Sequence, residues 1–305
     1  MKEFASDLRF PEGPIALGDS SLLVVEIAAG RLTRITPDGT KRTVAELGGG
    51  PNGAAMGPDG RCYICNNGGF VWRERDGVLL PSGTAADYIG GSIQAVDIET
   101  GAVETLYTAC EGQKLNGPND IVFDSSGGFW FTDHGHAHGR HRDRGAVYYA
   151  RPDGSLIKQA IYPLEMPNGI TLAPDEKTLY VAETVTGRLW AWTIDTPGNI
   201  ARAARNILGG TGRIVIGLGG FQLFDSMAVD AAGNLHIGTV PSGISVVSPE
   251  GLLLEQIAMP EPFATNVCFG ATDPQTMYVT LSSTGKVIAL KSTYSGAPTN
   301  FPHPG

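Results

Sequence analysis

Residues 119–133 read NDIVFDSSGGFWFTD, two short apolar strands joined by a polar turn at Asp124. The same order of polar residue, apolar strand, turn and second apolar strand occurs six times along the chain. The copies begin at Glu12 (EGPIALGDSSLLVVE), Asn52 (NGAAMGPDGRCYICN), Asn119, Asn168 (NGITLAPDEKTLYVAE), Asp225 (DSMAVDAAGNLHIGT) and Asn266 (NVCFGATDPQTMYVT). Repetition of one unit along a chain indicates a repeat architecture, in which each unit is one supersecondary element.

Each copy continues into a third strand, such as GRLTRITPDG from Gly30 or GAVYYARPDG from Gly145. An outer fourth strand follows in most units, as in TKRTVAEL and LIKQAIY. Six such units predict an all-β fold, a six-bladed β-propeller with four-stranded antiparallel blades around a central channel. We expect residues 1–305 to form one domain. The tail of about residues 292–305 is rich in Ser, Pro, Thr and Gly, and we expect it to be peripheral.

The composition narrows the possible partners. Charged residues make up 17% of the chain and the net charge is −9, with no basic stripe that would bind nucleic acid. No apolar run is long enough for a membrane span and the N-terminus lacks a signal peptide, so we expect a cytoplasmic protein with small-molecule partners. Four cysteines are too few for a disulfide scaffold, and Cys62-x-x-Cys65 lacks a second such pair for zinc.

The residue that opens each first strand is polar in all six units. We call these residues the openers: Glu12, Asn52, Asn119, Asn168, Asp225 and Asn266. The first strand of a blade lies nearest the propeller axis, so the openers should form a ring at one end of the channel. Carboxylate and amide oxygens suit Ca²⁺ best, and Mg²⁺, Mn²⁺ and Zn²⁺ remain alternatives. The competing interpretation is that the openers cap turns around a water-filled channel.

Insertions between second and third strands should lie at the same end of the molecule. One spans Asn67–Gly91 and the other His134–Arg144, and the connection that contains Phe221 and Phe224 returns to the same rim. Together they could wall an apolar pocket above the metal. The run HGHAHGRHRDR is a lid or a second metal site, and its spacing fits no ordinary zinc pattern. His134 directly follows a second strand and is a candidate substrate contact.

Five motifs, in order, extend over nearly the whole chain: FPEGP, GPNDIVFDSSGGFWFTD, MPNGITLAPDEKTLYVAET, DSMAVDAAGNLHIGT and ATNVCFG. In these motifs the chain resembles the regucalcin and gluconolactonase family of metal-dependent lactonases. More loosely, it is similar to bacterial calcium lactonases and to the propeller phosphotriesterase diisopropyl fluorophosphatase.

The resemblance implies that Glu12, Asn168 and Asp225 are metal ligands. It makes Asn119 a fourth ligand or a substrate contact, and Ser226 a further candidate ligand. We predict substrate contacts from Asn52, Asp120, His134, Phe224 and Asn266. Animal regucalcins carry an Arg directly before the Asn-Asp pair, whereas this sequence has Pro118, which argues against an aldonolactone substrate.

These assignments predict a hydrolase that opens a lactone or related ester. The metal would polarise the carbonyl and stabilise the oxyanion, and Asp225 would orient and deprotonate the attacking water. Two other functions fit the same residues. One is hydrolysis of a phosphoester or P–F bond, and the other is a non-enzymatic calcium-binding platform.

Overall fold

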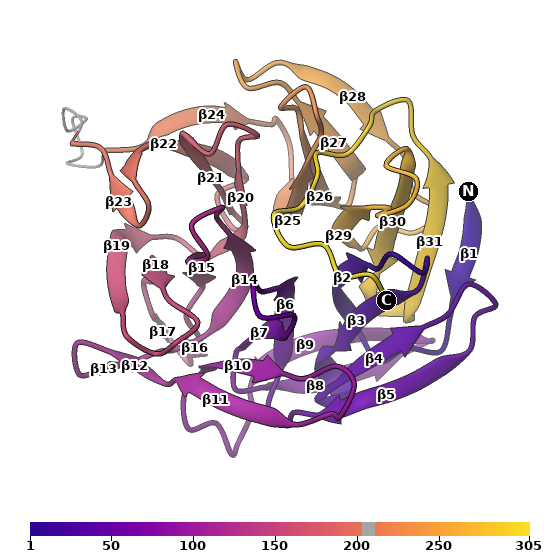
Figure 1. Ribbon diagram of the computed structural model, residues 1–305, viewed down its shortest axis with the longest axis horizontal. Helices are drawn as coiled ribbons and strands as arrows, with labels where there is room; N and C mark the ends of the chain where they lie inside the picture. Colours follow the sequence, from indigo (N-terminus) through magenta and orange to yellow (C-terminus); the bar gives the residue numbers. More distant parts are fainter. Residues whose placement is uncertain (203–210) are drawn as a thin grey trace.

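The computed structural model describes residues 1–202 and 211–305, and it confirms a six-bladed β-propeller. Six antiparallel sheets surround a central channel, and most contain four strands (Figure 1). In each sheet the first strand of the repeat is innermost. No helix within the described residues is long and apolar enough to cross a membrane.

The first three blades follow the predicted repeat directly. Blade 1 consists of β2 (Pro11–Ala16), β3 (Leu22–Glu26), β4 (Arg31–Ile35) and β5 (Lys41–Glu46). Blade 2 consists of β6 (Pro51–Met56), β7 (Cys62–Asn66), β10 (Ser92–Val96) and β11 (Val103–Tyr107). Blade 3 consists of β14 (Pro118–Phe123), β15 (Phe129–Asp133), β18 (Gly145–Ala150) and β19 (Ile157–Leu164).

The last three blades vary at their outer edges. Blade 4 consists of β20 (Pro167–Leu172), β21 (Thr178–Glu183) and β22 (Arg188–Thr196), with β23 (Asn199–Ile200) and β24 (Arg213–Gly217) both paired to β22. Blade 5 consists of β25 (Leu223–Val229), β26 (Leu235–Val240), β27 (Gly243–Val247) and β28 (Leu253–Ile257). Blade 6 contains β29 (Ala264–Phe269), β30 (Thr276–Leu281) and β31 (Lys286–Lys291).

The N-terminal strand closes the ring. β1 (Lys2–Ala5) pairs with β31 in antiparallel register and supplies the outermost strand of blade 6. The first and last strands of the chain are therefore joined within one sheet, which pairs an otherwise free edge of β31. This pairing brings together residues far apart in the chain, such as Lys2 and Ala289, so no local sequence pattern predicts it.

Apolar side chains fill the seams between neighbouring blades. Successive side chains of a strand point to opposite faces of its sheet, so each sheet contributes to two seams. Cys62 packs with blade 1 residues and Cys65 packs with blade 3 residues, and all four cysteines are free thiols. The two cysteines of the Cys-x-x-Cys pair therefore point to opposite faces of their sheet.

The C-terminal tail has a defined course instead of lying at the periphery. We call residues 295–305 the C-terminal strap, which runs across the end of the channel opposite the openers (Figure 1). Ala231 N donates to Ser295 O, and Gly18 N donates to His303 O at the other side of the channel. These backbone hydrogen bonds hold the strap to blades 5 and 1, which composition alone does not predict.

Candidate functional site

A β-bulge lies next to the opener in every innermost strand. The pairing register shifts between Glu12 and Ile15 in β2, and shifts at the corresponding place in β6, β14, β20, β25 and β29. A bulge changes the direction of the side chains beside it. The openers therefore do not follow the ordinary alternation of side chains between the two faces of the strand. All openers except Asp225 are more than nine-tenths buried, and Asp225 retains partial exposure.

Small residues beside the openers let the inner strands approach. A Cβ atom on Gly53 would lie 2.6 Å from Asp120 Oδ1, and one on Gly169 would lie 2.5 Å from Asp225 O. Both distances are shorter than a real Cβ contact. The Asn-Gly pairs at two openers are therefore required by the close packing around the axis.

Glu12 is held in place by the opener of the neighbouring blade. Asn266 Nδ2 donates to Glu12 Oε2 at 2.7 Å, and Gly13 N donates to the same oxygen at 3.0 Å. Asn266 Oδ1 in turn accepts from Val267 N at 2.7 Å. Asn266 therefore positions Glu12, and its role as a substrate contact stays a prediction.

Asn168 presents its amide oxygen to blade 5. Its Nδ2 donates to Thr184 Oγ1 at 3.1 Å, and Ser226 Oγ donates to its Oδ1 at 3.4 Å. The structure thus brings together Asn168 and Ser226, two of the predicted ligands, beside Asp225. Thr184, which fixes the amide orientation, was not among the predicted site residues.

Asp120 lies deeper along the channel and joins blade 3 to blade 4. Its carboxylate accepts from Ile121 N at 2.9 Å and from Ile170 N at 3.4 Å. Burial first, and then the charge of Glu12, raise the pKa of Asp120 to about 7 against hydrogen bonds that lower it. A charged carboxylate at this buried position needs a neighbouring cation to offset the cost of burial, and without one it would retain its proton.

Three carboxylates share this end of the channel. Burial is the first cause of a raised pKa at Glu12 and at Asp225, and the charge of Glu12 raises the pKa of Asp225 further. Across residues 1–202 and 211–305, none of the ion pairs involves Glu12, Asp120 or Asp225. Buried negative charge without a countercharge is costly.

The available donor atoms suit a hard cation. Asn119 is buried, and its Oδ1 has no hydrogen-bond partner in the described structure. Together with carboxylates, the Asn168 amide oxygen and the Ser226 hydroxyl, it gives an all-oxygen set of the kind that Ca²⁺ uses. No cluster of three or more His, Cys, Asp or Glu suited to a metal occurs in the described chain, so the fit depends on amide and hydroxyl oxygens.

A second layer of polar groups fixes the loops that carry the openers. Asp133, at the end of β15, accepts from Asn116 N and Gly117 N at 2.7 Å each. Glu183, at the equivalent place in blade 4, accepts from Glu165 N at 2.7 Å. Glu26 and Asn66 make the same contact in blades 1 and 2. The sequence does show a polar residue at the end of each of these second strands. It does not show that the side chain binds the backbone of the loop before the opener.

The two insertions form hairpins over the mouth of the channel. The first is β8 (Phe70–Arg75) with β9 (Val78–Thr84), and the second is β16 (Ala137–His138) with β17 (His141–Arg142). Trp72 packs on Phe10 of the segment before β2 with ring centroids 5.0 Å apart, so the first hairpin covers blade 1. That the second insertion acts as a lid stays a prediction.

Histidines of the second insertion join the two hairpins. His136 Nε2 lies 2.7 Å from Asn67 O, its Nδ1 lies 3.1 Å from Thr84 Oγ1, and its ring lies 4.5 Å from the Tyr88 ring. His138 pairs instead with Asp143 at 3.0 Å. These separate partners, and the lack of a suitable metal-binding cluster among the described residues, do not support a second metal site in this run.

Two predicted substrate contacts have different surroundings. His134 is buried, its Nδ1 has no partner among the described residues, and burial lowers its pKa to about 3. It is therefore a neutral imidazole at pH 7. Phe224 is fully buried with Tyr180 and Ala182 in the seam between blades 4 and 5. The prediction that Phe224 walls the mouth is wrong, because alternation turns its ring toward the neighbouring blade.

Comparison with known proteins gives the chain a family. Residues 10–283 match the family described as the SMP-30/gluconolactonase/LRE-like region. The chain is a member of this family. The SMP-30/gluconolactonase/LRE-like relatives include the gluconolactonase of Zymomonas mobilis, 28% identical over 91% of this chain and 78% of the relative. The lactonase drp35 of Staphylococcus haemolyticus is 30% identical over 82% of this chain and 69% of the relative.

Solved structures share the fold of this family member. A gluconolactonase from Xanthomonas campestris superimposes with a TM-score of 0.74 at 23% identity, covering 95% of this chain and 88% of its own. The calcium-binding protein regucalcin from Agrobacterium tumefaciens has a TM-score of 0.74 at 17% identity, covering 100% and 99%. At these identities the likeness supports the propeller fold.

Proposed function

We propose that this protein is a divalent-metal-dependent lactonase, with Ca²⁺ as the first candidate ion. The observation that carries the proposal is the group of carboxylates Glu12, Asp120 and Asp225, of which Glu12 and Asp120 are buried and none has a countercharge from the described side chains. A bound dication would neutralise much of this charge. Relatives named gluconolactonase and lactonase support ester hydrolysis as the reaction.

Glu12, Asn168 and Asp225 would hold the ion, with Asn119 and Ser226 as further oxygen donors. When bound, the ion would supply Lewis-acid polarisation of the carbonyl and charge stabilisation for the oxyanion. Glu12 is the more firmly fixed carboxylate, because Asn266 and Gly13 both donate to it. Asp225 retains partial exposure, unlike the buried Glu12 and Asp120, and is therefore the carboxylate better placed to reach water.

The proposed reaction begins when Asp225 accepts a proton from water. The water oxygen forms a bond to the lactone carbonyl carbon, the ring C–O bond then breaks, and the alcohol oxygen that leaves takes up the proton. Asn52, Asp120 and the neutral His134 are the proposed substrate contacts. A neutral imidazole offers a hydrogen bond and no charge, which favours an uncharged lactone over one that carries a carboxylate.

The test is lactone hydrolysis followed by pH-stat, with D-glucono-δ-lactone, an uncharged alkyl lactone and a phosphotriester as substrates. We expect turnover of a lactone by the wild type and at least a hundredfold loss in Asp225→Asn, since general acid–base groups contribute roughly 10²–10⁴-fold. Asp38→Asn, in an exposed turn at the opposite end of the molecule, is the matched control and should retain activity. Turnover of the phosphotriester alone, or metal binding without any turnover, would contradict the proposal.

A further inference from the structure

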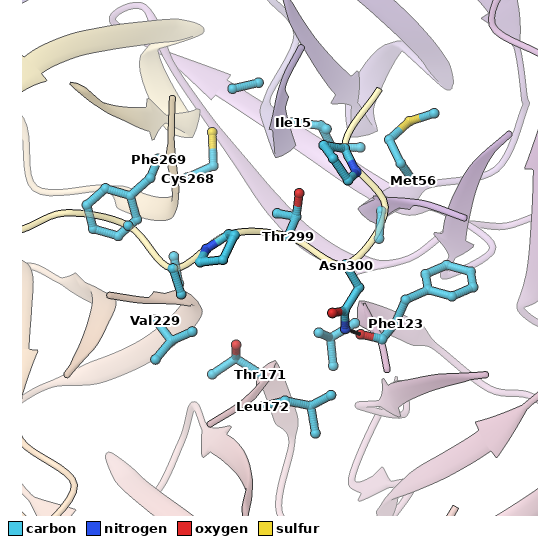
Figure 2. Close-up of a pocket in the computed structure, with 18 of the residues that line it drawn as sticks. Ile15, Met56, Phe123, Thr171, Leu172, Val229, Cys268, Phe269, Thr299 and Asn300 are labelled. Carbon is cyan, nitrogen blue, oxygen red and sulfur yellow. Dashed lines mark hydrogen bonds between the residues drawn. The ribbon is translucent and has the colours of Figure 1, made fainter. Parts of the chain in front are cut away.

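A cavity lies inside the channel, between the openers and the C-terminal strap. Its volume is about 570 Å³, within the range of small-molecule pockets. All six innermost strands line it, and the strap crosses it (Figure 2). We call this cavity the channel chamber. It is distinct from the mouth, which lies on the other side of the openers under the two hairpins.

The wall of the channel chamber is uncharged. At one level, equivalent positions of the six strands contribute mostly apolar side chains: Ile15, Ala55, Val122, Thr171, Ala228 and Cys268. Nearer the strap, five strands add larger apolar groups: Met56, Phe123, Leu172, Val229 and Phe269. The Thr171 hydroxyl is the hydrogen-bonding group of the first level. Such a surface favours an apolar ligand over water or an ion.

Acidic and basic side chains among the described residues line the chamber only at its two ends. Asp120 lies at the end beside the openers, and Glu176 and His303 lie at the strap. Two of these three groups are acids, so the ends disfavour an anion. Hydrogen bonds from Asn266 to Glu12 and from Ile170 to Asp120 cross between blades at the inner end. Asp120 and Asn266 therefore mark the end of the chamber that meets the openers.

The strap forms the floor of the chamber. Ala297 N donates to Val229 O in blade 5, and Asn300 Nδ2 donates to Phe123 O at 3.0 Å in blade 3. The Phe301 ring packs edge-on against Phe123 with centroids 5.8 Å apart. Figure 2 shows Thr299 and Asn300 of the strap between the side chains of the surrounding strands.

We propose that the channel chamber binds a small, uncharged and predominantly apolar organic molecule, at a site separate from the predicted metal centre. The volume, the uncharged wall and the acidic ends select this class of ligand. The proposal does not depend on lactone hydrolysis, because it concerns a cavity on the other side of the openers.

Fluorescence of the uncharged dye N-phenyl-1-naphthylamine tests the proposal on the full-length chain, with chelator and with calcium. We expect saturable binding of one dye per chain under both conditions. Ala228→Phe should weaken binding by about tenfold or more, a loss of 1.4 kcal/mol, because the new ring fills the chamber. Phe70→Ala, in the hairpin over the mouth, should leave the affinity unchanged.

Thiol protection provides a second readout that needs no variant. Cys268 is partly exposed and lines the chamber, whereas Cys62, Cys65 and Cys110 are buried. The dye should therefore slow alkylation of Cys268 by N-ethylmaleimide. Absence of saturable binding, weakening by Phe70→Ala instead of Ala228→Phe, or unchanged alkylation of Cys268 would each overturn the proposal.

Discussion

At the scale of single residues, some openers are hydrogen-bonded to other side chains, whereas others have a polar atom without a hydrogen-bond partner among the described residues. Glu12 and Asn266 hold each other across the boundary between blades 1 and 6. Asn119 is buried, yet its Oδ1 has no partner in the described structure. A buried acceptor without a partner costs free energy, so its presence is most simply explained by a ligand that completes the site.

Replacing Asn119 with Ala should therefore weaken metal binding more than it weakens the fold. We expect the dissociation constant for Ca²⁺ to rise by about tenfold or more, corresponding to loss of 1.4 kcal/mol. The melting temperature without metal should change little, because the side-chain oxygen makes no hydrogen bond. Isothermal titration calorimetry and differential scanning calorimetry measure the two quantities. Unchanged calcium affinity would exclude Asn119 as a ligand.

Asp133 acts through the backbone that leads to Asn119. Asp133→Asn replaces one acceptor oxygen with an NH₂ group that faces backbone donors. We expect the free energy of unfolding to fall by about 1–3 kcal/mol, the cost of a buried unsatisfied group. Urea denaturation measures this change, with Asp87→Asn, at an exposed aspartate, as the control. Equal stability of the two variants would show that the hydrogen bonds from Asn116 N and Gly117 N to Asp133 add nothing to the stability of the fold.

At the scale of elements, the repeat predicts the blades but not the contacts that complete the ring. Strand alternation and turn residues are local signals, so the inner strands and the openers could be located from sequence. Pairing of β1 with β31 and the course of the strap depend on contacts between distant segments. The prediction for Phe224 was wrong because Phe224 still pairs in regular register with Thr239, directly before the bulge, so strand alternation turns its ring into the seam between blades.

Removal of residues 295–305 should destabilise the propeller. The strap contributes backbone hydrogen bonds at Ser295, Ala297 and His303, together with the Asn300 and Phe301 contacts to blade 3. At about 1 kcal/mol for each hydrogen bond, a loss of roughly 2–4 kcal/mol is expected after the ordering entropy of the strap is regained. Chemical denaturation of the full-length and shortened chains measures the difference. An unchanged midpoint would mean that the strap is only loosely held.

At the scale of the whole molecule, the two ends of the channel have different chemistry. One end combines buried acids, amide oxygens and two covering hairpins, and the other has tight turns and the strap. The sequence locates the first end because a polar residue recurs near the start of all six inner strands, although in blade 6 the register puts Thr265, and not Asn266, at the position equivalent to the other openers. It does not show the chamber, since a cavity depends on how far six strands stand from a common axis.

The central claim is that the acids at the openers serve a metal on which lactone hydrolysis depends. The most direct measurement follows turnover of one lactone by chelated protein as Ca²⁺ is returned stepwise, with bound calcium measured in the same samples. Activity should be absent after chelation and return in proportion to about one bound ion per chain. Full activity in protein shown to contain no metal would contradict the claim.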